Sequence, residues 1–257
     1  MSSAVVSGTL DAQGVLHIRL EDSAGANGLT EALITGLSEQ LAVARTPATK
    51  VVVLSGLPDV FCSGATLELL SQLTRGELNP SELLLPRLLL ETPVPVIAAM
   101  EGSAVGGGFA LALAADLIVL ARESRYGFNF MDLGFTPGMG STRLAEHVLS
   151  PAVAHELLYT GEMRKGVQFA GCTGINAVLP RNEVLEHAGN LAARIAEKPR
   201  EALELLKLTL SSPRRQWFEE SRTLESLMHH VTFRRPDLQK QIEAMFVSHK
   251  PPGSTST

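Results

Sequence analysis

Cysteine is scarce in this 257-residue sequence: there are two cysteines, Cys62 and Cys172, and they lie far apart. Their spacing fits no metal-ligand pattern. The adjacent histidines His229 and His230 point to different sides of a helix, so we do not expect them to share a metal ion. The sequence therefore predicts no metal site, and it predicts two reduced thiols in a reducing compartment.

Long apolar runs and an excess of basic charge are also lacking. The longest apolar stretch, Phe109–Ala121, is interrupted by Asp116 and is too short to span a bilayer. The N-terminal segment has neither a basic region nor a long apolar run, so we expect no secretory signal. The formal net charge is −5, which argues against nucleic-acid binding. We therefore expect a cytoplasmic protein that binds neither a membrane nor a nucleic acid.

The first half of the sequence shows strand patterns that alternate with helix patterns, which predicts a layered α/β core. The expected strands are Val15–Leu20, Val51–Leu54, Pro95–Met100 and Leu117–Leu120, and the expected helices are Glu31–Ala44 and Gly107–Ala115.

The second half is mostly helical, and Pro199 and Pro213 are each expected to mark the start of a helix. We divide the chain into a core of residues 1–197, a C-terminal helical region of residues 198–248 and a tail of residues 249–257 whose composition predicts disorder. The expected helices are Ala152–Leu158, Glu183–Glu197, Arg200–Leu210 and Trp217–Val231.

Two loop-to-helix junctions, Phe61–Ala65 and Gly102–Gly108, are rich in small residues, and each follows an expected strand. Small residues let the backbone approach a ligand, and N–H groups at a helix start are unpaired and partly positive. Two such junctions side by side would offer two donors to one oxygen, which is an oxyanion hole. Tight turns for strand–helix packing explain the pattern equally well. A phosphate loop is a poor third explanation, because no Gly-Lys-Ser/Thr follows the glycines.

Three sequence blocks contain these junctions: FCSGA, PVIAAMEGSAVGGGFALALAADLIVLA and YGFNFMDLGFTPGMGSTRL. In their order and spacing they resemble the crotonase (enoyl-CoA hydratase/isomerase) superfamily. The resemblance implies an α/β crotonase fold, with a repeated ββα spiral core and a C-terminal helical trimerisation region. It implies a homotrimer or dimer of trimers, and a substrate that is a CoA or phosphopantetheine thioester, with no separate cofactor. It assigns the oxyanion donors to the backbone N–H groups of Ala65 and Gly107, with Gly106 as a substrate contact.

Two glutamates that hydratases of this superfamily use are missing. Their positions hold Ala110 and Phe130, and neither side chain can move a proton. We therefore expect neither hydration nor ordinary double-bond isomerisation, whose glutamate also falls at Phe130. Asp132 is the nearest acid, and its place beside the Gly134 turn favours a surface or capping role.

The decarboxylases of polyketide β-branching are a crotonase subgroup that the chain resembles more closely, in VIAAMEG, NFMDLGFTPGMG, RIAEKPR and MHHVTF. The resemblance implies decarboxylation of a 3-methylglutaconyl-type thioester on an acyl carrier protein, through a dienolate that His229 protonates. A helix-surface or subunit-interface role is the alternative for His229. The residues expected to form an apolar pocket around the substrate are Phe128, Phe130, Met131 and Leu133.

The chain departs from this subgroup at one functional position. Where the subgroup has a lysine, an ungapped alignment places Asn79, which can donate hydrogen bonds but carries no charge. Arg75 could bind the leaving carboxylate with two hydrogen bonds, or could be a solvated loop charge. Two rival functions stay open: an enoyl-thioester isomerase that uses Asp132 or His229, and a non-catalytic crotonase-fold scaffold in a biosynthetic complex.

Overall fold

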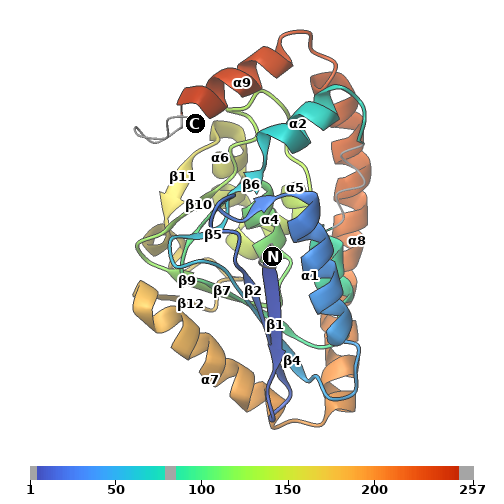
Figure 1. Ribbon diagram of the computed structural model, residues 1–257, viewed down its shortest axis with the longest axis vertical. Coiled ribbons are helices and arrows are strands. Elements are labelled where there is room, and N and C mark those ends of the chain that lie inside the picture. Colours follow the sequence, from blue (N-terminus) through green and yellow to red (C-terminus); the bar gives the residue numbers. More distant parts are fainter. Residues whose placement is uncertain (1–4, 79–84, 249–257) are drawn as a thin grey trace.

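The computed structural model describes residues 5–78 and 85–248 (Figure 1). A six-stranded sheet forms its centre, and β1 pairs with β2 in antiparallel fashion while the other neighbours are parallel. The inner strands are rich in Val, Ile and Leu because helices cover both faces of the sheet. In spatial order the strands are β1 (Val6–Leu10), β2 (Val15–Leu20), β4 (Val51–Ser55), β7 (Val96–Met100), β9 (Leu117–Ala121) and β12 (Ala177–Leu179).

Short strands build a second, four-stranded sheet and a two-stranded ladder next to it. Each of β4, β7 and β9 is followed along the chain by one short strand of the second sheet, and then by at least one helix. The chain thus repeats a ββα unit and winds as a spiral. The short strands are β5 (Val60–Cys62), β8 (Ser103–Val105), β10 (Arg125–Gly127) and β11 (Met163–Lys165), with β3 (Gly28–Leu29) and β6 (Gly64–Ala65) in the ladder.

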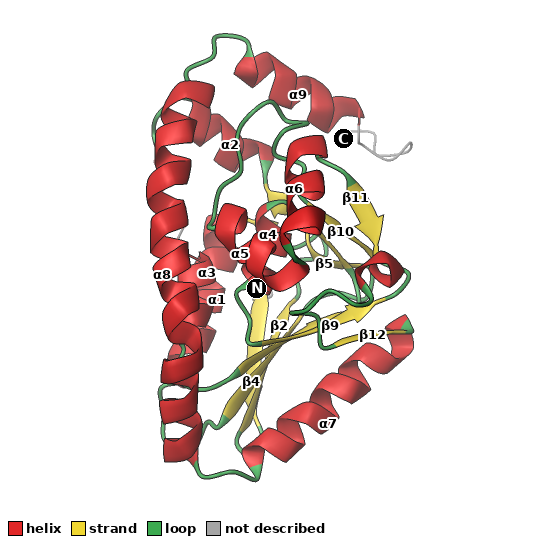
Figure 2. Ribbon diagram, turned by 180° about the vertical axis from the view of Figure 1, so that it is seen from behind, coloured by secondary structure: helices red, strands yellow, loops and turns green. Residues whose placement is uncertain are grey.

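The helices form two layers around the main sheet. Alanines and Val184 of α7 pack on one face, and the other face supports the larger apolar cluster, which includes α1 and α4 (Figure 2). Among the described residues, no helix combines the length and the apolar character that crossing a bilayer requires. The helices are α1 (Glu31–Val43), α2 (Leu67–Thr74), α3 (Leu85–Glu91), α4 (Gly107–Leu113), α5 (Ser141–Leu149), α6 (Pro151–Thr160), α7 (Val184–Ala196), α8 (Arg200–Thr232) and α9 (Leu238–Ser248), with 3₁₀ turns at Gly166–Phe169 and Arg181–Glu183.

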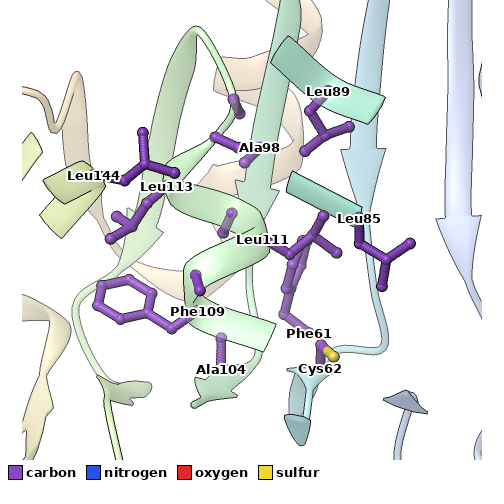
Figure 3. Packing of buried hydrophobic residues seen from close by; sticks show 14 of the residues in the cluster. Phe61, Cys62, Leu85, Leu89, Ala98, Ala104, Phe109, Leu111, Leu113 and Leu144 are labelled. Atoms are coloured by element: carbon purple, nitrogen blue, oxygen red, sulfur yellow. The ribbon is translucent and has the colours of Figure 1, made fainter. Parts of the chain in front are cut away.

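The central helix α4 is buried along its whole length. In Figure 3, Leu111 of this helix lies toward Phe61 of β5 and Leu85 of α3, and on the other side of the helix Leu113 lies near Leu144 of α5. Phe109 packs on the rings of Tyr126, Phe128 and Phe169. Fully buried side chains at successive positions hold α4 rigidly. The first turn of α4, which carries the second glycine-rich junction, therefore has a fixed place in the fold.

Polar contacts then fix the long helix α8 against the end of α4. The buried Lys207 donates to Asp116, with Nζ 2.6 Å from Oδ2, and to the carbonyl of Leu89 at 3.1 Å. Arg214 donates to the carbonyls of Leu113 and Ala115 at 2.7 and 2.8 Å. These bonds hold α8 in register with the core, and this sets where the C-terminal end of α8 lies.

One secondary-structure prediction is wrong. Pro213 does not start a helix, because it lies inside the continuous helix α8. An internal proline costs about 3 kcal/mol, since it removes one N–H donor and crowds the preceding turn. Buried residues on both sides of the proline, among them Leu203 and Phe218, outweigh this cost by tying both halves of α8 to the core.

The C-terminal helices share the main hydrophobic core. Phe218 of α8 and Leu238 and Ile242 of α9 belong to the same apolar cluster as α1 and α4. The division into a core of residues 1–197 and a helical region of residues 198–248 stays a prediction, and the tail of residues 249–257 lies outside the described residues.

Candidate active site

The two glycine-containing junctions lie against each other. A Cβ atom on Gly64 would be 2.5 Å from the carbonyl oxygen of Val105 and 3.5 Å from the nitrogen of Gly107. A Cβ atom on Gly108 would be 2.4 Å from the carbonyl oxygen of Cys62. Only glycine lets the two backbones approach this closely. The structure thus brings Ala65, which follows Gly64, into the neighbourhood of Gly107.

Gly106 sets the direction of the second junction. Its φ of 53° and ψ of −118° suit glycine, and its N–H donates to the carbonyl of Gly127 at 2.9 Å. Gly107 follows as the first residue of α4, so its N–H has no partner within the helix. This geometry supports the predicted donor role of Gly107, which stays a prediction together with that of Ala65.

The turn of residues 136–140 contacts both the second junction and α8. A Cβ atom on Gly107 would be 2.6 Å from the sulfur of Met139, so this side chain covers the start of α4. A Cβ atom on Gly138 would be 2.9 Å from Cε1 of His229. One short turn therefore separates the proposed oxyanion donors from the proposed proton donor.

His229 lies in the protein interior near the C-terminal end of α8. The residue is 6% exposed, and its Nε2 atom is 2.9 Å from the carbonyl oxygen of Thr136. A carbonyl oxygen only accepts, so Nε2 carries the proton of this hydrogen bond. Burial lowers the pKa of His229, while the carbonyls of Thr136 and Pro137 act in the opposite direction. The neutral imidazole is therefore the favoured form at pH 7 in the free protein.

The neighbouring His230 has a different environment. It is exposed, and its Nε2 atom accepts a hydrogen bond from Nη2 of Arg234 at 2.8 Å. The two adjacent histidines thus point to different sides of α8, as the sequence predicts. Across residues 5–78 and 85–248, His, Cys, Asp and Glu side chains form no group of three that could hold a metal ion.

Aromatic rings connect the second junction with His229. Phe130 lies 3.7 Å from the position of a Cβ atom on Gly106, and its ring centroid is 5.9 Å from that of Phe135. Phe135 is 4.9 Å from Phe233, which is 5.2 Å from the imidazole of His229. A continuous apolar path therefore runs between the two parts of the candidate site.

The remaining members of the predicted apolar pocket divide into two groups. Phe128 and Leu133 are buried, and Phe128 stacks on Phe130 with ring centroids 6.0 Å apart. Met131 is 43% exposed and lies at the surface of the single chain. Its role as a substrate contact, like that of Phe130, stays a prediction.

A cavity of about 740 Å³ opens beside His229, between the end of α2 and the segment that joins α8 to α9. Arg75 contributes to its wall, so the structure brings two predicted site residues together. The guanidinium of Arg75 is half-exposed and pairs with Glu77 at 2.9 Å and Glu68 at 3.6 Å. Asn79 lies outside the described residues. The described lining residues are Leu73, Thr74, Arg75, Gly76, Leu78, Ser226, His229, His230, Phe233, Arg234, Arg235, Pro236 and Gln239.

Comparison with known proteins places the chain in a family. The family described as enoyl-CoA hydratase/isomerase matches residues 11–253. The chain belongs to the enoyl-CoA hydratase/isomerase family. The resemblance inferred from the three sequence blocks is confirmed, and so is the expected crotonase fold.

Similar members of the enoyl-CoA hydratase/isomerase family include decarboxylases. The bacillaene synthase decarboxylase PksI of Bacillus subtilis is 35% identical over 233 residues, which are 90% of this chain and 94% of that protein. The ECH2 decarboxylase domain of CurF from Lyngbya majuscula is 37% identical with a TM-score of 0.88, over 95% of this chain and all of that domain. A structure from a dehydratase/decarboxylase couple of polyketide β-branching is 34% identical with a TM-score of 0.90, over 94% of this chain and 99% of that one.

The two positions at which the resemblance places the glutamates of hydratases are apolar here. Ala110 is fully buried in α4, and Phe130 is part of the aromatic path. Asp132 is exposed, and its carboxylate lies against Gly161, where a Cβ atom would be 2.6 Å from its Cγ. The surface position expected for Asp132 agrees with this arrangement.

Sequence reasoning missed one buried acid near the candidate site. Glu225 is 2% exposed and lies one helical turn before His229 on α8. Burial raises the pKa of Glu225 to about 7, against the opposing effect of hydrogen bonds from Thr142 and Gly140. The only sequence signal was its position four residues before His229, on the same face of the helix.

Proposed function

We propose that this protein is a decarboxylase of polyketide β-branching that acts on a 3-methylglutaconyl-type thioester on an acyl carrier protein. The observation that carries this proposal is a buried histidine at a cavity, joined to the glycine junctions by apolar residues. An oxyanion site at which the two expected glutamate positions hold Ala110 and Phe130 suits a reaction in which CO₂, not a proton, leaves the substrate. Similarity to PksI and the CurF domain, both decarboxylases, supports the same reaction.

The first step is the loss of CO₂ from the γ-carboxylate. The carbon–carbon bond breaks, and its electron pair flows through the conjugated system into the thioester oxygen, which gives a dienolate. The N–H groups of Ala65 and Gly107 would stabilise this oxygen by about 3 kcal/mol per donor. The rings of Phe128 and Phe130 would favour neutral CO₂ over the charged carboxylate.

The second step is protonation of a dienolate carbon by His229, which gives a 3-methylcrotonyl-type thioester. The acid must be the imidazolium, because a neutral imidazole is too weak an acid for this step. Burial favours neutral His229 in the free protein. A substrate carboxylate that enters the cavity would raise the pKa of His229, since an opposite charge nearby favours the charged form. The substrate would thus bring about the protonation that the reaction needs.

Binding of the carboxylate is proposed to involve Asn79 or Arg75. The ion pairs of Arg75 with Glu77 and Glu68 occupy part of its donor capacity. We therefore favour Asn79, and we expect Asn79→Ala to reduce decarboxylation more than Arg75→Ala. The reverse order would assign the carboxylate to Arg75.

The carrier protein or CoA partner is inferred from the charge of the cavity. The described lining residues include Arg75, Arg234 and Arg235 as well as two histidines, and none of them is an acid. This lining is complementary to the phosphate of a phosphopantetheine or CoA arm. We also propose that the protein acts in the cytoplasm, a compartment in which the thiols of Cys62 and Cys172 would stay reduced.

A homotrimer or dimer of trimers is proposed from exposed leucines on α8. Single exposed apolar side chains are common, but several on one helix are typical of an interaction surface. We expect light scattering at micromolar concentration to report a trimer or hexamer, and a stable monomer would contradict this assembly. The exposed side chains are Leu205, Leu206, Leu208, Leu210, Leu224, Leu227 and Val231.

The proposed reaction is tested by incubating the protein with 3-methylglutaconyl thioesters of CoA and of a carrier protein. A decarboxylase would reduce the substrate mass by one CO₂. An isomerase would exchange protons with deuterated water without releasing CO₂, and a scaffold would leave both thioesters unchanged. Either of the last two outcomes would reject the proposal.

A further inference from the structure

Glu225 is a buried carboxylate with three hydrogen-bond donors. Its Oε2 atom accepts from the N–H of Gly140 at 2.8 Å, and its Oε1 atom accepts from the N–H and the hydroxyl of Thr142 at 3.0 and 2.8 Å. These donors favour the ionised carboxylate, and burial opposes them and raises the pKa of Glu225 to about 7, so both forms are present at neutral pH.

These donors lie at the end of the turn of residues 136–140 and just after it. Gly140 ends this turn, and Thr142 lies in the first turn of α5. At the other end of the turn, the carbonyl of Thr136 accepts from His229, and the hydroxyls of Thr136 and Thr232 are 3.2 Å apart. Three successive turns of α8 therefore hold the two ends of one short segment.

Between these ends, the segment contacts both parts of the candidate site. Met139 has a φ of 60°, which costs a non-glycine residue free energy and persists only where its surroundings impose it. Its sulfur lies against Gly107, while Gly138 lies against His229. A shift of this segment would therefore change the position of His229 relative to the start of α4.

A purely structural role for Glu225 would be to complete the N-terminus of α5. Carboxylates favour such positions because of the helix dipole. No side chain at Gly140 could take over this role, because a Cβ atom there would be 2.3 Å from the ring of Phe218 and the φ of 77° suits glycine. The position of Glu225 beneath the turn that holds His229 points to more than capping.

We propose that Glu225 is a positioning residue: it holds the turn of residues 136–140, so that the Thr136 carbonyl and Met139 fix His229 relative to Gly107. This inference rests on the proposed decarboxylation. Glu225 would not touch the substrate and would act through His229. Its loss would reduce the rate of proton delivery more than it would reduce substrate binding.

The test compares Glu225→Ala and Glu225→Gln with the control Glu220→Ala. Glu220 lies on the same helix and also connects α8 to α5, through an exposed ion pair with Arg143 at 2.9 Å. We expect Glu225→Ala to lower kcat about ten- to hundredfold while KM changes little. Glu225→Gln keeps one acceptor oxygen and should recover part of kcat, and Glu220→Ala should behave like the wild type.

An NMR titration of His229 supplies a readout that does not depend on turnover. In the wild type, burial lowers the pKa of His229 more than the Thr136 contact raises it. If the loss of Glu225 frees the turn of residues 136–140, the pKa of His229 should rise toward the ordinary value of 6.5. An unchanged His229 pKa in folded Glu225→Gln would overturn the proposal, and so would a fall in kcat and stability without that change. If the wild type releases no CO₂ but the pKa still moves in the variants, the positioning role stands and the proposed function fails.

Discussion

Replacement of Gly138 by alanine would place a methyl group against the imidazole of His229. The new Cβ atom would lie 2.9 Å from Cε1 and 3.3 Å from Nε2, and ordinary contacts begin near 3.4 Å. Gly138 is not one of the glycines with positive φ, so alanine can adopt its backbone conformation. The substitution therefore acts on the side chain of His229 and leaves the local fold intact.

The magnitude follows from these distances. The ring must retreat by about 0.5 Å, which weakens the 2.9 Å hydrogen bond between Nε2 and the Thr136 carbonyl. A weakened neutral hydrogen bond and mild overpacking together cost about 1–3 kcal/mol of stability. A displaced proton donor lowers the rate more strongly, and we expect kcat for decarboxylation to fall about ten- to hundredfold.

The assay is single-turnover decarboxylation of a 3-methylglutaconyl thioester, with thermal unfolding measured in parallel. Gly189→Ala is the matched control, because it lies in α7 and no atom lies within 4 Å of its added Cβ. Alanine there should be neutral in activity and should stabilise the helix by about 0.5–1 kcal/mol. Wild-type turnover by Gly138→Ala would refute the claim that the position of His229 limits the reaction.

Three further predictions concern stability and specificity. Asp116→Ala should lower the free energy of unfolding by about 3–5 kcal/mol in urea denaturation, because Lys207, 4% exposed, loses its carboxylate partner. Crotonyl thioester should give no 3-hydroxyacyl product by mass spectrometry. Ala110 and Phe130, which stand where hydratases carry glutamates, cannot activate water. Between about pH 4.5 and 7, the folded wild type binds a proton at Glu225 that the unfolded chain has lost. As the pH rises through this interval, the free energy of unfolding of the wild type should therefore fall by about 3 kcal/mol relative to that of Glu225→Gln. If the free energy of unfolding of the wild type relative to Glu225→Gln stays constant or increases as the pH rises through this interval, the pKa of Glu225 is not raised.

The sequence predicted the strands and helices whose signals are local. The β-branched run at Val51–Leu54 became β4, and the glycines before Gly107 marked the start of α4. Helix α5 was not predicted. Its N-cap is Gly140, which has no capping side chain, and the carboxylate that binds its first N–H groups is Glu225, which lies 85 residues further along the chain. Local patterns cannot reveal an anchor that arrives through the tertiary fold.

The candidate site, like the fold, could be predicted from the sequence only in part. The sequence alone left a helix-surface or subunit-interface role open for His229. Packing of the 136–140 turn decides, because Gly138 and the Thr136 carbonyl cover His229 and leave its neighbour exposed. Pro213 shows the opposite case, in which a strong local signal for a helix start is overruled by core contacts on both sides.

CO₂ release by His229→Gln and His230→Gln tests the central claim most directly. Both variants are compared with the wild type on a 3-methylglutaconyl thioester, with fold and assembly checked by circular dichroism and light scattering. We predict that His229→Gln loses most product formation while its fold is unchanged, and that His230→Gln, altered at an exposed ring, stays close to the wild type. Near-wild-type formation of the 3-methylcrotonyl-type product by His229→Gln would contradict the proposed mechanism.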